Sequence, residues 1–108
     1  MKTNINLIVM LTLNDFTVKN AAEIFEECKN SDVKYWGIKE KGLPINDMKR
    51  LCHHMKECGK IAILEVVAYT EDEGLAGAQI AVECGFDILM GTIFSDTINE
   101  YCKKNNLK

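Results

Sequence analysis

The feature that most constrains this chain is a fourfold repeat of short apolar runs. The runs are Ile5–Leu11, Val33–Ile38, Ile61–Val67 and Asp87–Met90. Their first residues lie about 26 to 28 residues apart, a spacing typical of proteins built from repeated supersecondary units. Each run has few polar positions, so the strand that it predicts is expected to be buried on both faces, as in a parallel sheet covered by helices.

The segments between these runs carry the signals of helix ends. Residues that mark helix starts are Thr17, Pro44, Thr70 and Ser95, and residues that mark helix stops are Gly59 and Gly85. Thr17 is expected to cap the first helix with its hydroxyl. Pro44 fits a first helical turn, and Thr70 with Glu73 has the spacing of a capping box. The sequence therefore predicts one helix after each strand.

The predicted order is four strand–helix units in a single α/β domain over residues 1–108. Consecutive units of this kind form a parallel sheet through right-handed crossovers. Two architectures satisfy the pattern: half of a TIM barrel with strand order 1-2-3-4, and a flavodoxin-like, doubly wound sheet with order 2-1-3-4. The near-equal repeat favours the half-barrel.

Charge and hydropathy exclude two classes of partner. The formal net charge is −3 and the chain has no arginine-rich run, so the basic footprint that nucleic-acid binding requires is missing. No run approaches the ~18 apolar residues of a membrane span. The first apolar run is interrupted by Asn6 and followed by Asp15 without a small-residue cleavage site, so we interpret it as a strand rather than a signal peptide.

Five cysteines and an adjacent pair of histidines raise the question of a disulfide or a metal site. Four of the cysteines recur near predicted helix ends, at Cys28, Cys58, Cys84 and Cys102. Because no CxxC occurs, we expect small apolar packing residues in a reducing compartment. His54 and Cys58 have helical i, i+4 spacing, but no further ligand lies nearby in sequence. We therefore predict a cytoplasmic protein without a metal or a cofactor.

Two segments resemble units of a known class of barrel. Residues 57–66 read Glu-Cys-Gly-Lys-Ile-Ala-Ile-Leu-Glu-Val, and residues 83–92 read Glu-Cys-Gly-Phe-Asp-Ile-Leu-Met-Gly-Thr. These helix–glycine–strand joints resemble those of phosphate-binding TIM barrels of the ribulose-phosphate-binding type. The resemblance implies the N-terminal half of such a barrel and a small anionic substrate. It also implies a phosphate site in loops after strands seven and eight, which lie outside these four units.

Half of a barrel has two unpaired edge strands. Exposed N–H and C=O groups along an apolar edge are a template for association. We therefore expect the chain to pair with itself, as a homodimer or a higher homo-oligomer. Two copies either close an eight-stranded twofold barrel or pack sheet against sheet.

Polar residues at the ends of the predicted strands are the candidates for chemistry, because barrel sites lie at the carboxyl ends of strands. Strand alternation puts Lys39 on the face of Gly37 and Glu65 on the face of Ile63. Burying either charge beneath a helix layer is costly, so both side chains are expected in the barrel mouth, about 5 Å apart.

Lys39 and Glu65 are therefore the candidate catalytic residues. The ammonium would stabilise a developing oxyanion and the carboxylate would move a proton. A neighbouring carboxylate favours the charged ammonium, which argues against a Schiff-base lysine. The alternative is a salt bridge that orders the mouth.

Four further residues are candidates for substrate binding. Asn14 and Asp15 follow the first strand, and Gly91 and Thr92 end the fourth. Free N–H groups after Thr92 could hold a phosphate or carboxylate at a helix start, although an ordinary helix cap at Ser95 or Asp96 explains the same residues.

Two functions stay open on the sequence. The first is a half-barrel domain of an aldolase-, isomerase- or decarboxylase-like enzyme that acts on a small phosphorylated or carboxylated carbonyl substrate. The second is a non-catalytic half-barrel whose defined property is self-association. A receiver-like domain would need a phosphoacceptor aspartate at the end of a later strand, and the third strand supplies none.

Overall fold

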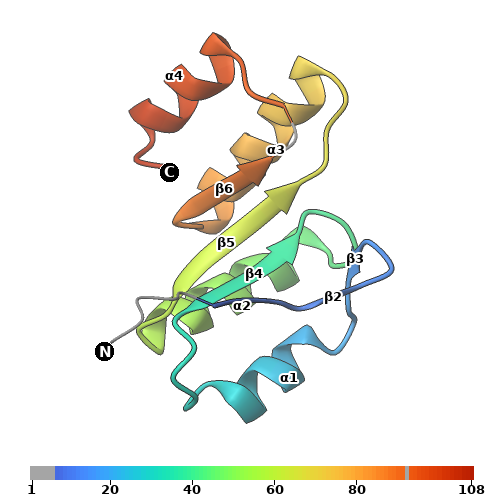
Figure 1. Cartoon of the computed structure of the whole chain (residues 1–108), viewed down its shortest axis with the longest axis vertical. Helices are drawn as coiled ribbons and strands as arrows, with labels where there is room; N and C mark the ends of the chain where they lie inside the picture. Colours follow the sequence, from blue (N-terminus) through green and yellow to red (C-terminus); the bar gives the residue numbers. More distant parts are fainter. Residues whose placement is uncertain (1–6, 92) are drawn as a thin grey trace, which may run out of the picture.

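A four-stranded parallel sheet with four helices forms the body of the protein (Figure 1). The computed structural model describes residues 7–91 and 93–108. The strands of the sheet are β1 (Ile8–Met10), β4 (Tyr35–Lys39), β5 (Ile61–Val66) and β6 (Ile88–Gly91). The helices are α1 (Ala21–Cys28), α2 (Ile45–Glu57), α3 (Glu71–Cys84) and α4 (Asp96–Lys104). The predicted α/β class with one helix after each strand is confirmed.

The strands lie in the sheet in the order in which they occur in the chain, β1-β4-β5-β6. Each neighbouring pair is parallel. A flavodoxin-like order would place β1 between β4 and β5, whereas β4 pairs directly with β5 along its whole length. The observed order is the one predicted for a half-barrel.

All four helices contribute to one core on a single face of the sheet. Trp36 and Ile38 of β4, and Ala62, Leu64 and Val66 of β5, are buried there among helix residues. The ring of Phe25 in α1 meets Trp36 edge-on, with centroids 5.1 Å apart. Successive members of this strand face are two positions apart in the sequence, as the alternation of β-strands requires. The opposite face of the sheet therefore has no helix layer among the described residues.

That opposite face is apolar and open. Ile8, Tyr35, Ile63, Ile88 and Met90 surround a hollow of ≈ 290 Å³ on it. Ile8 is 45% exposed and Met90 36% exposed. This face of the sheet therefore presents apolar side chains to solvent.

Helix α3 approaches the sheet closely because it carries small residues. A Cβ placed on Gly77 would lie 2.4 Å from Cγ1 of Val66, well inside contact distance. Glycine at position 77 therefore allows this close packing of α3 against β5.

The predicted helix signals are confirmed for three of the four helices. Pro44 precedes the first turn of α2. The side chains of Thr70 and Ser95 accept hydrogen bonds from the N–H groups of Glu73 and Ile98, and so cap α3 and α4. These bonds satisfy N–H groups that the helix itself leaves unpaired.

Helices α2, α3 and α4 end in the same way, which explains the repeat. Each is followed by a residue with positive φ: Gly59 (78°), Gly85 (88°) and Asn106 (56°). The next N–H in each case bonds back to the helix, from Lys60 to Met55, Phe86 to Ala81 and Leu107 to Cys102. The following N–H bonds to a sheet strand or its start: Ile61 to Lys34, Asp87 to Ala62 and Lys108 to Asp87. Each of these joints returns the chain to the amino edge of the sheet.

The first unit differs from the prediction. Thr17 does not cap a helix: α1 begins at Ala21, after Asn20, whose side chain makes no capping bond. Thr17 lies instead in a small antiparallel hairpin of β2 (Thr12–Leu13) and β3 (Phe16–Thr17). This hairpin lies beside the carboxyl end of β4 (Figure 1). The prediction was wrong because a buried hydrogen-bonding role for Thr17 has no local signature.

Candidate functional site

The β2–β3 hairpin carries Asp15 to the carboxyl edge of the sheet. Its two-residue turn is Asn14-Asp15, with φ of 53° and 66°, between the cross-strand partners Leu13 and Phe16. Two consecutive residues with positive φ are typical of a type I′ turn, and Asn and Asp tolerate this conformation better than other non-glycine residues. The local sequence therefore favours the turn that presents Asp15.

Thr17 fixes the hairpin to β4. The ladder between β1 and β4 ends where the N–H of Leu11 donates to the carbonyl of Gly37 (2.9 Å). Beyond that point the Thr17 hydroxyl bonds the backbone of β4: it accepts a hydrogen bond from the N–H of Lys39 (3.0 Å) and donates one to the carbonyl of Lys39 (2.9 Å). The Thr17 side chain thus takes the place of a neighbouring strand for the buried backbone of Lys39. This satisfies an N–H and a carbonyl that would otherwise be buried without partners.

Gly42 allows the hairpin to approach the loop that follows β4. The N–H of Thr17 donates to the carbonyl of Lys41 (2.9 Å). Gly42 has φ of 113°, and a Cβ there would lie 2.4 Å from the backbone oxygen of Thr17. Both observations require glycine at this position.

Lys39 lies at the meeting point of three carboxylates. Its Nζ donates to Oδ1 of Asp15 at 3.2 Å. Its Cα is the register partner of Glu65 on β5, as predicted from strand alternation. The hydrogen bond to Asp15 raises the pKa of Lys39, and the charges of Glu65, Asp15 and Glu40 raise this pKa further, against the opposing effect of burial. The side chain is therefore a stable ammonium that is only 11% exposed.

The Asp15 side chain is 92% exposed, so solvent weakens its electrostatic attraction to Lys39. Exposed pairs of this kind contribute about 1 kcal/mol or less to stability. We conclude that the pair orients the ammonium more than it stabilises the fold.

A pocket of ≈ 390 Å³ opens at this edge of the sheet. Its lining residues come from the hairpin, the end of β4 and the loop after β5, and they are Asp15, Phe16, Lys39, Glu40, Lys41, Val67 and Tyr69. This volume suits a small metabolite. One oxygen of Glu40, Oε2, is buried and has no hydrogen-bond partner among the described residues.

The structure brings together only part of the predicted site. Lys39 and Glu65 share the carboxyl edge, but Lys39 forms its ion pair with Asp15, and Glu65 does not line the pocket. Asn14 is an exposed turn residue that does not line the pocket. Gly91 pairs with Val66 on the neighbouring strand β5 and does not line the pocket either. Thr92 lies outside the described residues.

Several pocket residues were not identified from the sequence. Phe16 and Tyr69 line the pocket because of a hairpin and a loop whose course depends on tertiary contacts. The Asn14-Asp15 pair between alternating residues was a usable hairpin signal. The Lys39–Glu40–Lys41–Gly42 run after a strand was a usable loop signal, since its glycine follows a cluster of charges.

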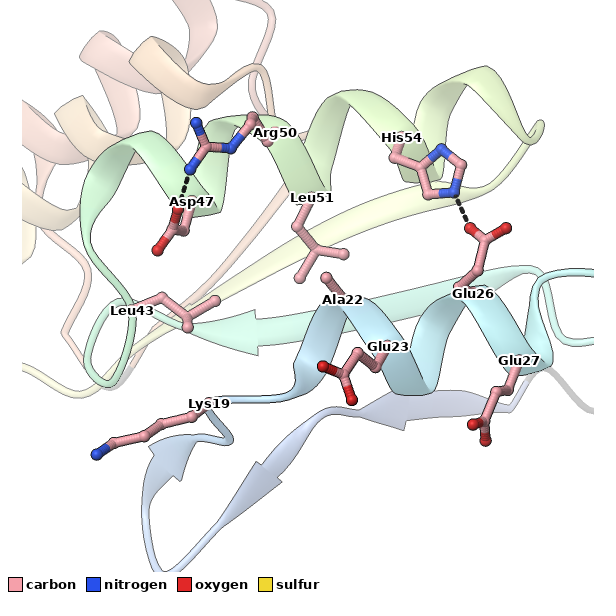
Figure 2. Close-up of a pocket in the computed structure, with 10 residues that line it drawn as sticks. All are labelled: Lys19, Ala22, Glu23, Glu26, Glu27, Leu43, Asp47, Arg50, Leu51 and His54. Carbon is pink, nitrogen blue, oxygen red and sulfur yellow. Dashed lines mark hydrogen bonds and ion pairs between the residues drawn. The ribbon is translucent and has the colours of Figure 1, made fainter.

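A larger groove of ≈ 670 Å³ lies between α1 and α2, on the helix side of the protein. Figure 2 shows Ala22, Leu43 and Leu51 facing the space between the two helices. The ring of His54 bonds Oε2 of Glu26 at 2.6 Å and also packs edge-on against Phe25. His54 of α2 thus joins the two helices at the surface.

We place the candidate site at the smaller pocket because of its charges. In the groove, Glu26 already bonds His54 and Asp47 already bonds Arg50. At the carboxyl edge, in contrast, one buried ammonium faces several carboxylates beside an open volume. Convergent charged groups in a pocket are the stronger sign of a chemical site.

The cysteines pack as predicted. Cys52 and Cys84 are buried, and Cys28, Cys58 and Cys102 are partly buried against the core. Burial raises the pKa of Cys52 to about 12 and raises the pKa values of Cys84 and Cys102. Within residues 7–91 and 93–108, no group of three or more His, Cys, Asp or Glu side chains is placed to hold a metal ion.

The described helices include none with the length and apolar character needed to cross a membrane. The fold and the site together define a four-unit α/β protein with a polar pocket at the carboxyl edge of its sheet. Comparison with known proteins found no matching family model, curated protein or solved structure.

Proposed function

We propose that this protein is a half-barrel whose carboxyl-edge pocket binds a small carbonyl compound bearing a carboxylate, and that it catalyses proton transfer next to the carbonyl. The observation that carries the proposal is the buried Lys39 ammonium, which Asp15 holds at the edge where β4 and β5 end. Reactions of this class include those of isomerases, aldolases and decarboxylases. The resemblance of two segments to ribulose-phosphate-binding barrels is consistent with it.

The roles follow from charge and hydrogen bonding. The raised pKa of Lys39 suits an electrophile that stabilises an oxyanion, and it opposes a role as a neutral nucleophile. Glu65 is the register partner of Lys39 on the neighbouring strand and is not one of the pocket-lining residues. Its carboxylate forms no hydrogen bond or ion pair among the described residues. In the proposed step, Glu65 removes a proton from the carbon next to the carbonyl. The C–H electron pair forms the enolate C=C bond, and the oxyanion that results lies against Lys39.

The test uses pyruvate, the smallest keto acid, in deuterium oxide. The protein should catalyse exchange of the pyruvate methyl protons for deuterium, measured by proton NMR. Lys39→Met and Glu65→Gln should each abolish the exchange while the protein stays folded. A matched control is Lys60→Met, because the Lys60 ammonium also forms hydrogen bonds, to the backbone oxygens of Ser31 and Val33, but at the amino edge of the sheet.

The control should exchange pyruvate protons at the wild-type rate. If Lys39→Met retains both pyruvate binding and exchange, the proposed role of Lys39 is wrong. If the wild-type protein neither binds pyruvate nor catalyses exchange, the proposed function as a whole is wrong.

A second candidate function is self-association, which the open apolar face of the sheet favours. The outer edges of β1 and β6 have no strand partner among the described residues, apart from the single bond from Lys108 to Asp87. Both edge strands run in the same direction, so a twofold axis along the sheet's strands would bring β6 of one copy beside β1 of another. Eight strands are enough to close a barrel with a side-chain-filled interior.

The self-association test is the molecular mass in solution. Sedimentation equilibrium at micromolar concentration should give a dimer for the wild-type chain and a monomer for Met90→Lys. Gln79→Lys makes the same substitution at an exposed position of α3 and should remain a dimer. A monomeric wild-type chain would rule out this candidate.

A further inference from the structure

Large exposed apolar side chains gather at two places in the described chain. The seven are Leu7, Ile8, Leu13, Phe16, Tyr69, Met90 and Phe94. Ile8 and Met90 belong to the open sheet face, and Leu7 directly precedes Ile8 in the chain. Leu13, Phe16, Tyr69 and Phe94 instead lie on the hairpin and loops that follow strands β1, β5 and β6, at the carboxyl edge. The helices carry none of the seven, and four of them lie on segments at the carboxyl edge of the sheet.

Two of these side chains, Phe16 and Tyr69, line the pocket that contains Lys39. Phe16 is 53% exposed and Tyr69 is 82% exposed. They come from β3 and from the loop after β5, so they approach the pocket from different segments. Leu13 and Phe94 are equally exposed, at 67% and 63%, but do not line the pocket.

We infer that the ligand of this pocket is a 2-keto acid with an aromatic side chain, whose ring lies against Phe16 and Tyr69 while its oxygens face Lys39. This inference rests on the proposed function and specifies its substrate class. The exposed aromatic rings provide an apolar surface, and the ammonium beside them provides a positive charge. A ligand with both a ring and a carboxylate is complementary to this pair of features. Val67, which also lines the pocket, extends the apolar side.

The affinity expected from this contact is measurable. Burying a ring against two partly exposed aromatic side chains should make binding at least about ten-fold tighter than for a ligand without the ring. Phenylpyruvate and pyruvate differ by that ring and share the keto acid group, so their dissociation constants isolate the contribution of the ring.

The experiment measures both dissociation constants by ligand-detected NMR for the wild-type protein and four variants. Phe16→Ser and Tyr69→Ser should each weaken phenylpyruvate binding several-fold and leave pyruvate binding unchanged. Leu13→Ser and Phe94→Ser are the matched controls, because they remove equally exposed side chains from neighbouring segments outside the pocket lining. Both controls should keep the wild-type preference for phenylpyruvate.

The outcomes separate this inference from the proposed function. If the wild-type protein binds pyruvate and phenylpyruvate equally, the aromatic specificity is wrong and the proposed function stands. If the preference survives both Phe16→Ser and Tyr69→Ser, or is lost equally in the controls, the assignment to these two residues is wrong. If neither keto acid binds, the proposed function and this inference both fail.

Discussion

Replacing Thr17 by valine removes one hydroxyl and should lower the stability of the whole domain. Thr17 is only 3% exposed, and its hydroxyl makes both hydrogen bonds to the backbone of Lys39. Valine keeps the shape but leaves one buried N–H and one buried carbonyl without partners. An unsatisfied buried group costs about 1–3 kcal/mol, so we expect a loss of about 2–6 kcal/mol for the two groups.

Thr17→Ser is the matched control, since it keeps the hydroxyl and removes one methyl group worth roughly 0.8 kcal/mol. Urea denaturation followed by circular dichroism gives both free energies of unfolding. A thermal scan should show Thr17→Val melting at least ~10 °C below the wild-type protein, because each kcal/mol shifts a domain of this size by several degrees.

A loss in Thr17→Val no larger than in Thr17→Ser would refute the reasoning. It would mean that the hydroxyl does not substitute for a strand partner at Lys39. The hairpin would then have another anchor, and the position of Asp15 would need a different explanation. Hydrogen exchange of the Lys39 amide gives the same answer locally: it should be slow in the wild type and in Thr17→Ser, and fast in Thr17→Val.

Three further predictions follow from packing and ionisation. Gly77→Ala should destabilise the protein by about 1–3 kcal/mol in urea denaturation, because the new Cβ would collide with Val66. This cost outweighs the gain of about 1 kcal/mol in helix propensity from alanine. A stabilised variant would contradict the packing of α3 against Val66. Cys52, with its pKa raised to about 12, should be among the last thiols alkylated at pH 8 in native protein, as mapped by mass spectrometry, and early labelling of Cys52 would show that α2 opens readily. The folded pKa of Lys39 lies above its ordinary value of 10.5, so the stability that the Asp15–Lys39 pair adds should be constant from about pH 7 to 9 and be lost only as the pH rises through that folded pKa. The difference in unfolding free energy between wild type and Lys39→Met measures this, and a difference that fades below pH 9 would show a lowered pKa instead.

Much of the fold could be predicted from the sequence because its signals are local. The joint Gly85-Phe86 needs a left-handed residue, and only glycine supplies that conformation without strain. Thr70 caps a helix three residues away, so its signal spans one turn. Strand alternation then placed Lys39 and Glu65 side by side at one edge, which the register of β4 and β5 confirms.

The rest of the site could not be predicted because it depends on contacts between distant segments. Thr17 and Lys39 are 22 residues apart, and nothing near Thr17 shows that its hydroxyl bonds a strand backbone. The same contact brings Asp15 to Lys39, so the ammonium forms its ion pair with the hairpin and not with Glu65. Phe16 enters the pocket lining as a further consequence.

The most direct test of the account is to map where a keto acid binds. Phenylpyruvate titrated into ¹⁵N-labelled protein should shift amide signals in three segments that meet at the carboxyl edge, residues 15–17, 39–42 and 67–69. The shifts should disappear in Lys39→Met. Shifts confined to residues 22–27 and 47–54 would place the ligand in the α1–α2 groove instead, and would contradict the claim that the Lys39 pocket is the functional site.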